Sequence, residues 1–264
     1  MALEENRYGM REIQQTLLRM ASEIDRVCRA HGIEYSLYGG TMLGAVREGG
    51  FIPWDDDLDM VFTAGELERF VSVFPRECRE YTVTRTDTWV ARVVPRGERD
   101  LSSPFVDLFH YEPISADKRL QRRKLFRLRL LQGMLKERID YAQYAWKDRA
   151  LVLGSHLLGL PFSKALKLRW YQNAARSQVR GDGTLLQIAD DCFAGLAHLY
   201  PGTCAERFED ILFEGMAFRV SAEKERMLRL KYGDGYMTPP PEAERRARHL
   251  AGGFAAARTE RPRA

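Results

Sequence analysis

The residues from 35 to 62 constrain the fold of this chain more than any other stretch. A short apolar run ends at Tyr38, the pair Gly39-Gly40 follows, and a second apolar run begins at Leu58. Adjacent glycines allow a sharp turn and a close approach of the backbone to a ligand. The stretch therefore predicts a buried strand, a tight turn, a short helix and a second strand.

The glycine turn is a candidate phosphate-binding site. We expect the short helix to open at Thr41, directly after the turn. The first N–H groups of a helix have no partner within the helix and lie at the positive end of its dipole. Gly39, Gly40 and Thr41 are therefore the candidate phosphate-binding residues. Arg47, one or two turns further on, is a candidate for an additional charge-assisted contact.

Acidic residues gather just before and within the second strand, in the run DDDLD that starts at Asp55. Because side chains alternate along a strand, Asp57 and Asp59 are predicted to point to the same face. Two neighbouring carboxylates repel each other, and a hard divalent cation such as Mg²⁺ or Mn²⁺ between them would remove the repulsion. A solvated acidic turn is the alternative, and the glycine turn and the apolar strand favour the metal site.

A further carboxylate, Asp107, lies within the apolar run FVDLFHY that begins at Phe105. An unpaired charge is costly to bury, so Asp107 requires a partner, and a structural salt bridge is one possibility. Arg92 and Arg96, on a preceding predicted strand, either face a nucleotide or are solvated. His110 is expected to be an ordinary core or surface histidine.

The run GGTMLGAVREGGFIPWDDDLDMVF resembles the signature of the LicD family, a phosphocholine-transferase-like branch of the nucleotidyltransferase-fold superfamily. That superfamily pairs a Gly-Gly or Gly-Ser turn with an apolar strand that carries two alternating acidic residues, and residues 57–60 match this pattern. The stretches FEGMAFRV from Phe213 and LRLKYGDGYMTPPP from Leu228 also resemble the family. The resemblance covers most of residues 33–241 and is faintest in the middle.

The resemblance implies a mixed α/β fold with a small mixed sheet flanked by helices and a helical C-terminal part. It implies a metal-dependent transferase that moves a phospho-substituent, such as phosphocholine, from a CDP-linked donor to a hydroxyl of a cell-surface glycan or its lipid-linked precursor. Asp107 resembles the third acidic residue of the superfamily, so Asp57, Asp59 and Asp107 are the expected catalytic residues and Mg²⁺ or Mn²⁺ ligands. Asp107 is the candidate general base, because an apolar setting raises a carboxylate pKa.

Two other functions use the same residues. A nucleotidyltransferase would move the nucleoside monophosphate to a small acceptor with the same aspartates. A non-catalytic nucleotide-binding module would keep the fold and dispense with turnover, and the presence of all three carboxylates counts against it.

The 264-residue chain is predicted to have a catalytic core over residues 1–113 and a helical acceptor-shaping section over 114–241. A hairpin and a helix at the end of that section are expected to complete the site, and residues 242–264 to form a flexible basic tail. Helices are predicted over 3–31, where apolar residues recur at three- and four-residue spacing, over 63–75, with Thr63 and Glu66 as a capping box, and over 117–131, 163–179 and 222–232. The helical run from 117 continues to about 147.

Strands are predicted over 81–85, 89–94 and 105–111, and residues 211–220 are predicted to form a hairpin broken at Glu214-Gly215. Residues 184–188 are either strand or loop. Lys231 and Tyr232, beside a glycine turn, either contact a phosphate or a ring or belong to an ordinary helix end.

Charge and composition limit the partners. The net charge is +4, and the tail from Pro239 supplies six arginines against three acidic residues, which leaves a nearly neutral body and argues against a nucleic-acid partner. Residues 117–131 hold seven basic residues and one acidic residue, so they form either a solvated flank or a contact with anionic lipid. The four cysteines lack zinc spacing, and no run approaches the ~18 apolar residues of a membrane span. A cytoplasmic location is expected, at the inner face of the membrane if that contact forms.

Overall fold

The computed structural model describes residues 8–85, 88–97, 103–136, 146–176, 184–245 and 247. The chain divides into two compact units. The first consists of Met1–Thr84, Ala91–Phe109 and Cys204–Ala264, and the second of Arg85–Val90 and His110–Thr203. One strand, β5 (Val106–Pro113), begins in the first unit and ends in the second.

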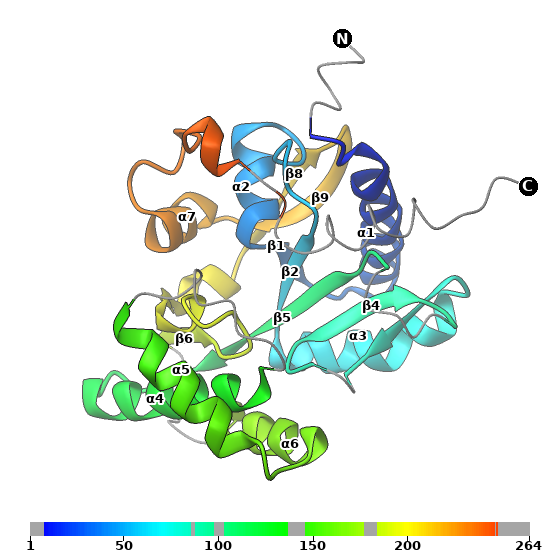
Figure 1. Ribbon diagram of the computed structural model, residues 1–264. Helices are drawn as coiled ribbons and strands as arrows, with labels where there is room; N and C mark the ends of the chain where they lie inside the picture. The colour runs from blue at the N-terminus through cyan, green and yellow to red at the C-terminus, as the bar shows by residue number, and fades with distance from the viewer. Residues whose placement is uncertain are drawn as a thin grey trace, which may run out of the picture. The chain divides into compact units, whose positions relative to one another are not determined.

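The first unit is built on strands in the order β1-β2-β5-β4-β3 (Figure 1). The remaining bounds are Tyr35–Leu37 for β1, Leu58–Thr63 for β2, Tyr81–Thr84 for β3 and Ala91–Pro95 for β4. Strand β1 pairs antiparallel with β2, and β4 pairs antiparallel with both β3 and β5. Helices α1 (Arg11–His31), α2 (Gly39–Arg47), α3 (Ala64–Glu77) and α7 (Lys224–Tyr232) belong to the same unit. The mixed α/β fold predicted from the sequence is confirmed.

Aromatic rings form the core between β1, β2 and α3. Successive ring centroids lie 5.8 Å apart for Tyr35 and Phe62, 5.4 Å for Phe62 and Phe70, and 4.7 Å for Phe70 and Phe74. Helix α1 adds an apolar face whose buried members are Ile13, Leu17, Met20, Ala21, Ile24, Val27 and Cys28. The three- and four-residue spacing that predicted an amphipathic helix is the spacing of this buried face.

Three helix boundaries in the first 80 residues differ from the predicted ones. Helix α1 begins at Arg11, after Gly9, which has a left-handed φ of +71°. Residues 3–7, where the predicted helix started, lie outside the described part. Helix α2 begins at Gly39, two residues before Thr41, with Tyr38 as its N-cap. Helix α3 continues past Pro75 to Glu77.

Two hydrogen bonds define the ends of α3. The N–H of Cys78 bonds to the carbonyl of Phe74 at 2.9 Å and closes the last turn around Pro75. At the other end, the Thr63 hydroxyl accepts from the N–H of Glu66 at 3.3 Å, as the predicted cap requires. Glu66 does not complete a capping box, because its carboxylate pairs with Arg69 at 2.8 Å.

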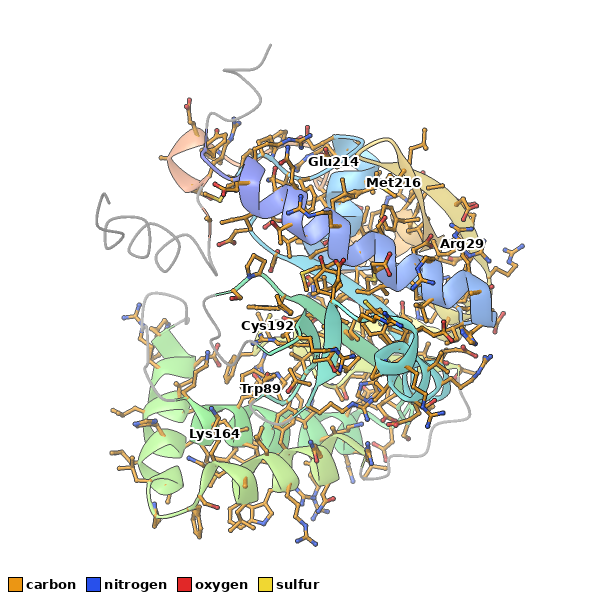
Figure 2. The ribbon with its side chains drawn as sticks, turned by 90° about the vertical axis from the view of Figure 1, so that its right-hand side faces the viewer. Arg29, Trp89, Lys164, Cys192, Glu214 and Met216 are labelled. Carbon is orange, nitrogen blue, oxygen red and sulfur yellow. The ribbon has the colours of Figure 1, made fainter. Side chains whose placement is uncertain are left out.

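The hairpin of β8 (Phe208–Phe213) and β9 (Met216–Ser221) turns at Glu214-Gly215, as predicted. The Glu214 carboxylate accepts from the Phe51 N–H at 3.1 Å and pairs with Arg11 at 2.7 Å. Figure 2 shows Glu214, Met216 and Arg29 along α1, and Arg29 bonds to Asp210 of β8 at 2.9 Å. The hairpin therefore joins α1 to the loop that precedes the aspartates.

The second unit contains α4 (Lys118–Leu135), α5 (Trp146–Gly159), α6 (Lys164–Arg176), β6 (Leu185–Ile188) and β7 (Leu199–Pro201). Short 3-10 helices span Gly195–Ala197, Gly202–Ala205 and Glu242–Glu244 along the chain. Strand β6 pairs antiparallel with residues 111–113 of β5 and with β7. The sequence left residues 184–188 undecided between strand and loop and did not predict β7. Helix α4 ends at Leu135, and residues 137–145, where the predicted helical run continued, lie outside the described part.

A partly buried ion network lies at the start of the second unit, in the half of β5 that follows Phe109. His110 Nδ1 lies 2.7 Å from Asp190 Oδ2, and its Nε2 lies 3.2 Å from Glu112 Oε1. Burial alone would lower the pKa of His110, but the charges and hydrogen bonds of Asp190 and Glu112 raise it to about 10. His110 is therefore a partly buried residue whose raised pKa favours the charged form at neutral pH.

Because His110 keeps its proton in the folded state, it should make stability depend on pH above its unfolded pKa. Its contribution is fully present below pH ~6.5 and is lost as pH rises toward about 10, by on the order of a few kcal/mol. Urea unfolding across this window should show a smaller loss of stability for His110→Gln than for the wild type. His31→Gln, which changes a more exposed histidine, is the control. Parallel pH profiles for wild type and His110→Gln would contradict the assignment.

Candidate functional site

Two carboxylates lie directly against the glycine turn. A Cβ atom at Gly39 would lie 2.5 Å from Asp59 Oδ2, and a Cβ atom at Gly40 would lie 2.7 Å from Asp55 Oδ2. Gly39 also has a φ of +56°, which residues with a side chain rarely adopt. Glycine at these positions is what allows the acidic groups and the backbone to approach each other.

Two hydrogen bonds fix the turn to β2. The N–H of Tyr38 donates to the carbonyl of Asp59 at 3.0 Å, and the N–H of Asp59 donates to Thr41 Oγ1 at 2.9 Å. The Thr41 hydroxyl thus holds the strand backbone, a role that the sequence analysis did not assign to it. The N-terminus of α2 consequently lies next to the Asp59 end of β2.

The acidic residues influence one another. Burial raises the pKa of Asp59 well above its usual value, and the charges of Asp57 and Asp107 raise it further, with a smaller effect from Asp55. Lys231 acts in the opposite direction. The structure therefore brings Asp57, Asp59 and Asp107 within electrostatic reach of one another, in a region that accumulates negative charge.

Asp107 has a salt-bridge partner. Arg92 faces it across the β4–β5 pair, and Arg92 Nε lies 2.6 Å from Asp107 Oδ1. The guanidinium also lies over the Phe105 ring, 3.9 Å from its centroid. Asp107, the candidate base named from the sequence, is thus paired with Arg92, and the pKa of Asp59 is raised.

These carboxylates offer hard oxygen donors, which suit Mg²⁺ or Mn²⁺. Within the part of the chain that the structure describes, no three acidic, histidine or cysteine side chains already converge as a metal site. The fit therefore rests on the donor chemistry and on the concentration of like charge at Asp57 and Asp59.

Helix α1 helps to position the acidic loop. Gln14 is buried, and its Nε2 donates to the backbone carbonyls of Ile52 at 3.2 Å and Asp55 at 3.0 Å. Asp56 is fully buried, between two neighbours that are only partly so. The alternating exposure from Asp57 to Met60 confirms the predicted strand register.

Arg47 lies at the opposite end of α2 from the glycine turn, a distance of about 12 Å along the helix axis. Its Nε pairs with Glu48 at 2.8 Å, and its Nη1 donates to the carbonyl of Tyr236 at 3.3 Å. Its Nη2 is buried and has no hydrogen-bond partner among the described residues. The structure thus places this guanidinium beside the loop after α7.

Lys231 is a site residue that the sequence analysis considered without including it among the candidates. Its Nζ donates to Tyr38 Oη at 2.8 Å and lies 4.3 Å from the centroid of the Tyr38 ring. It reaches the residue before Gly39 from the last turn of α7. The only signal in the sequence was its position beside the glycine-rich run after Tyr232.

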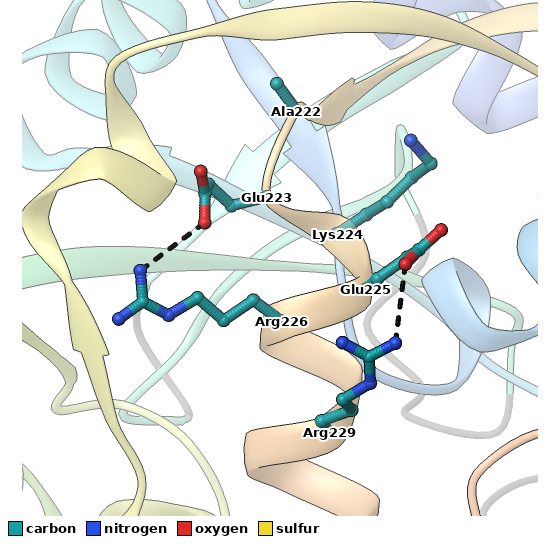
Figure 3. A pocket seen from close by; sticks show the side chains of 6 residues that line it. All are labelled: Ala222, Glu223, Lys224, Glu225, Arg226 and Arg229. Atoms are coloured by element: carbon teal, nitrogen blue, oxygen red, sulfur yellow. Dashed lines mark ion pairs between the residues drawn. The ribbon is translucent and has the colours of Figure 1, made fainter. Parts of the chain in front are cut away.

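A surface pocket of about 360 Å³ lies elsewhere, around the start of α7 (Figure 3). Its charges are already paired, Glu223 with Arg226 at 3.5 Å and Glu225 with Arg229 at 3.6 Å. None of the candidate residues lines it. We therefore place the candidate site at the Gly39 turn and not in this pocket.

Comparisons with known proteins point to the same region. Residues 32–126 match the family model described as LicD/FKTN/FKRP, nucleotidyltransferase domain. The chain is also similar to the lipopolysaccharide cholinephosphotransferase LicD of Haemophilus influenzae. The two are 30% identical over 267 residues, which cover 91% of this chain and 96% of the relative. The range of the family model contains every candidate site residue named from the sequence.

A matched pair of glycine variants tests the geometry of the turn. Gly39→Ala and Gly49→Ala both place a side chain at positive φ, at a cost of about 1–2 kcal/mol. Only at position 39 does the new Cβ meet a carboxylate, since nothing lies within 4 Å of a Cβ at Gly49. Both variants should lose similar thermal stability, and only Gly39→Ala should lose turnover. Equal activity in the two would place the reacting groups elsewhere.

Proposed function

Since this chain belongs to the LicD family of phosphotransferases, we propose that it transfers phosphocholine from CDP-choline to a hydroxyl of a cell-surface glycan such as lipopolysaccharide. The observation that carries this proposal is the group of carboxylates around the N-terminus of α2. Asp55 and Asp59 lie against the turn, and Asp57 and Asp107 act on Asp59 electrostatically. Such carboxylates can hold the divalent cation that binds a diphosphate, and one of them can accept the proton of the attacking hydroxyl.

The metal in this proposal is Mg²⁺ or Mn²⁺, with Asp57 and Asp59 as the main ligands. Such an ion supplies positive charge that neutralises the diphosphate and orients it for in-line displacement. Asp107 is the third ligand candidate, and it would have to loosen its ion pair with Arg92 to bind an ion directly. The first N–H groups of α2, from Gly39 to Thr41, are proposed to donate hydrogen bonds to the phosphate oxygens of CDP-choline.

The proposed reaction conserves bonds and charge. The acceptor oxygen attacks the phosphorus that carries choline, a new O–P bond forms, and the bond from that phosphorus to the bridging oxygen breaks. CMP leaves with the electron pair of that bond. The hydroxyl proton passes to a carboxylate of the cluster.

Asp59 and Asp107 are the two candidates for accepting this proton. Burial and neighbouring charges raise the pKa of the metal-free Asp59 carboxylate, but a bound cation would lower it, so a metal ligand at this position is a weaker base. Asp107 is held by Arg92 and would act as the base once that ion pair loosens. The expectation, drawn from the sequence, that Asp107 is the base stays a prediction.

Lys231 is proposed to contact the phosphate groups of the donor. Its ammonium group lies beside Tyr38, next to the turn that we propose as the phosphate site. It also reduces the negative potential at Asp59. A cation on α7 would attract an anionic donor to a site that is otherwise acidic.

The reaction can be tested with CDP-choline in which one phosphorus is labelled. Label at the choline-bearing phosphorus should appear in the glycan product, and label at the other should appear in CMP. Transfer of the nucleotide-borne phosphorus would indicate a nucleotidyltransferase instead. Magnesium-dependent binding with no transfer to any acceptor would indicate a binding module.

Asp57→Asn and Asp59→Asn should each reduce turnover by at least about a thousandfold, because each removes a ligand charge. Neither should unfold the protein, and Asp59→Asn should raise the stability of the metal-free form by on the order of 1 kcal/mol. A turnover assay and thermal unfolding measure these two effects, and calorimetry with Mg²⁺ measures the loss of metal affinity. Asp210→Asn, which alters an exposed ion pair with Arg29, is the control. Normal turnover in either site variant would remove the metal-site proposal.

Lys231→Met should raise the KM for CDP-choline about tenfold or more, since a charge-assisted contact to phosphate is lost. Lys231→Arg should recover part of the affinity because it restores a cation at the same place. The control is Lys224→Met on the same helix, whose partner Glu209 lies away from the site. Unchanged donor affinity in Lys231→Met, measured by calorimetry with the unreacted donor, would show that the lysine serves only to hold Tyr38.

A further inference from the structure

The exposed apolar side chains of this protein are concentrated in one place. Nine of the fourteen large hydrophobic residues that are exposed in the described part belong to α4, α5, α6 or the turn between α5 and α6. Five of them lie within residues 157–166, which we call the α5–α6 tip. The exposed fractions there are 55% for Leu157, 62% for Leu158, 64% for Leu160, 40% for Phe162 and 37% for Leu166. Such a density on a surface indicates an interaction site.

The tip is an ordered turn. The N–H of Leu160 donates to the carbonyl of Leu157 at 3.3 Å, and the N–H of Phe162 donates to the carbonyl of Gly159 at 3.2 Å. The Ser163 hydroxyl accepts from the Leu166 N–H at 3.3 Å and caps α6. Gly159 is packed against Met134 of α4, where an added Cβ would lie 2.8 Å away. These contacts fix the backbone of the tip. Its leucines are exposed, and the Phe162 ring packs edge-on against Trp170 of α6, with the ring centroids 4.9 Å apart.

The three helices around the tip are strongly basic. Helices α4, α5 and α6 together contain thirteen lysines and arginines and one acidic residue, Asp148. Their net charge of +12 exceeds the +4 of the whole chain, so the remainder of the chain is net negative. Lys164, labelled in Figure 2, and Arg169 lie on α6 itself. A partner for this region is therefore anionic as well as apolar.

We propose that the α5–α6 tip inserts into the interfacial layer of an anionic lipid bilayer, with basic residues of α4 to α6 at the level of the headgroups. Leucine and phenylalanine beside lysine and arginine are the composition of interfacial membrane segments. Aliphatic side chains at the tip have no comparable use against a nucleic-acid backbone. None of the described helices is long and apolar enough to cross a bilayer.

This surface differs from the one expected from the sequence. The basic run at residues 117–131 is not a uniformly free face. Lys124 is buried, and burial lowers its pKa. Arg129 lies over the Phe193 ring, 4.7 Å from its centroid, and bonds to the Phe193 carbonyl at 3.2 Å. The run contributes charge through its exposed members, whereas the apolar anchor is at the tip.

The proposed lipid contact rests on the proposed function in one respect: it serves the reaction if the glycan acceptor is linked to a lipid. It would hold the enzyme at the surface where such an acceptor is found. Lipid binding and turnover are therefore separate measurements. Activity on a water-soluble glycan acceptor reports on the proposed function alone.

Co-sedimentation of the full chain with phosphatidylglycerol-containing vesicles tests the proposal. We expect the wild type to bind these vesicles, to bind phosphatidylcholine vesicles weakly, and to lose part of its binding at high salt. Leu158→Ser/Leu160→Ser should reduce the partition coefficient about tenfold or more. Lys164→Gln/Arg169→Gln should lower binding at low salt only.

The matched control is Leu212→Ser/Leu230→Ser, which changes two exposed leucines of the first unit. It should leave vesicle binding unchanged. All variants should keep the melting temperature and the turnover of a soluble acceptor, because the altered side chains are on the surface.

Two results would overturn the proposal: the wild type fails to bind anionic vesicles, or the tip variant binds them as well as the wild type. If neither protein binds lipid, and sedimentation velocity shows that the wild type self-associates while Leu158→Ser/Leu160→Ser is a monomer, the tip is an interface between copies of the chain. If the wild type does not turn over a soluble acceptor, that result contradicts the proposed function and leaves the lipid-binding proposal standing.

Discussion

The backbone of Asp59 forms the two hydrogen bonds on which the candidate site depends. Its carbonyl accepts from the N–H of Tyr38, and its N–H donates to the Thr41 hydroxyl. Together they join the strand that carries the acidic residues to the turn that opens α2. The close approach of the Asp59 carboxylate to Gly39 follows from this connection. Carboxylates held this near to one another repel, and that repulsion is what a cation or a positively charged side chain would relieve.

Distant segments hold this arrangement in place. Gln14 of α1 bonds to the loop before the aspartates, and Glu214 of the β8–β9 hairpin bonds to Phe51 in the same loop. Lys231 of α7 reaches Tyr38. The elements at both ends of the first unit therefore support one loop and one turn. This is an effective design for a site with like charges, because rigid packing maintains a geometry that the charges alone would disperse.

Charge is distributed unevenly along the chain. The first unit holds an acidic site, with a few cations placed individually beside it. In the second unit, helices α4 to α6 carry a large excess of basic residues and most of the exposed apolar side chains. An enzyme that uses an anionic donor and acts on an acceptor at an anionic surface would need both properties.

Local sequence patterns determined much of the fold. Alternating apolar residues set the register of β2, so Asp57 and Asp59 were predicted correctly to share a face. The Thr63 cap and the Glu214-Gly215 turn were also readable, since each depends on a few neighbouring residues. The glycine turn followed from the same kind of pattern, whereas the mixed α/β fold was implied by the resemblance to the LicD family.

The partners of the charged groups were decided only by the tertiary structure. Arg92 reaches Asp107 through the register of β4 on β5, Asp190 reaches His110 from 80 residues away, and Lys231 reaches Tyr38 from 193 residues away. A strand register or a cap depends on nearby side chains and on backbone geometry. An ion pair between distant segments depends on how whole elements pack, and no short stretch of the sequence contains that information.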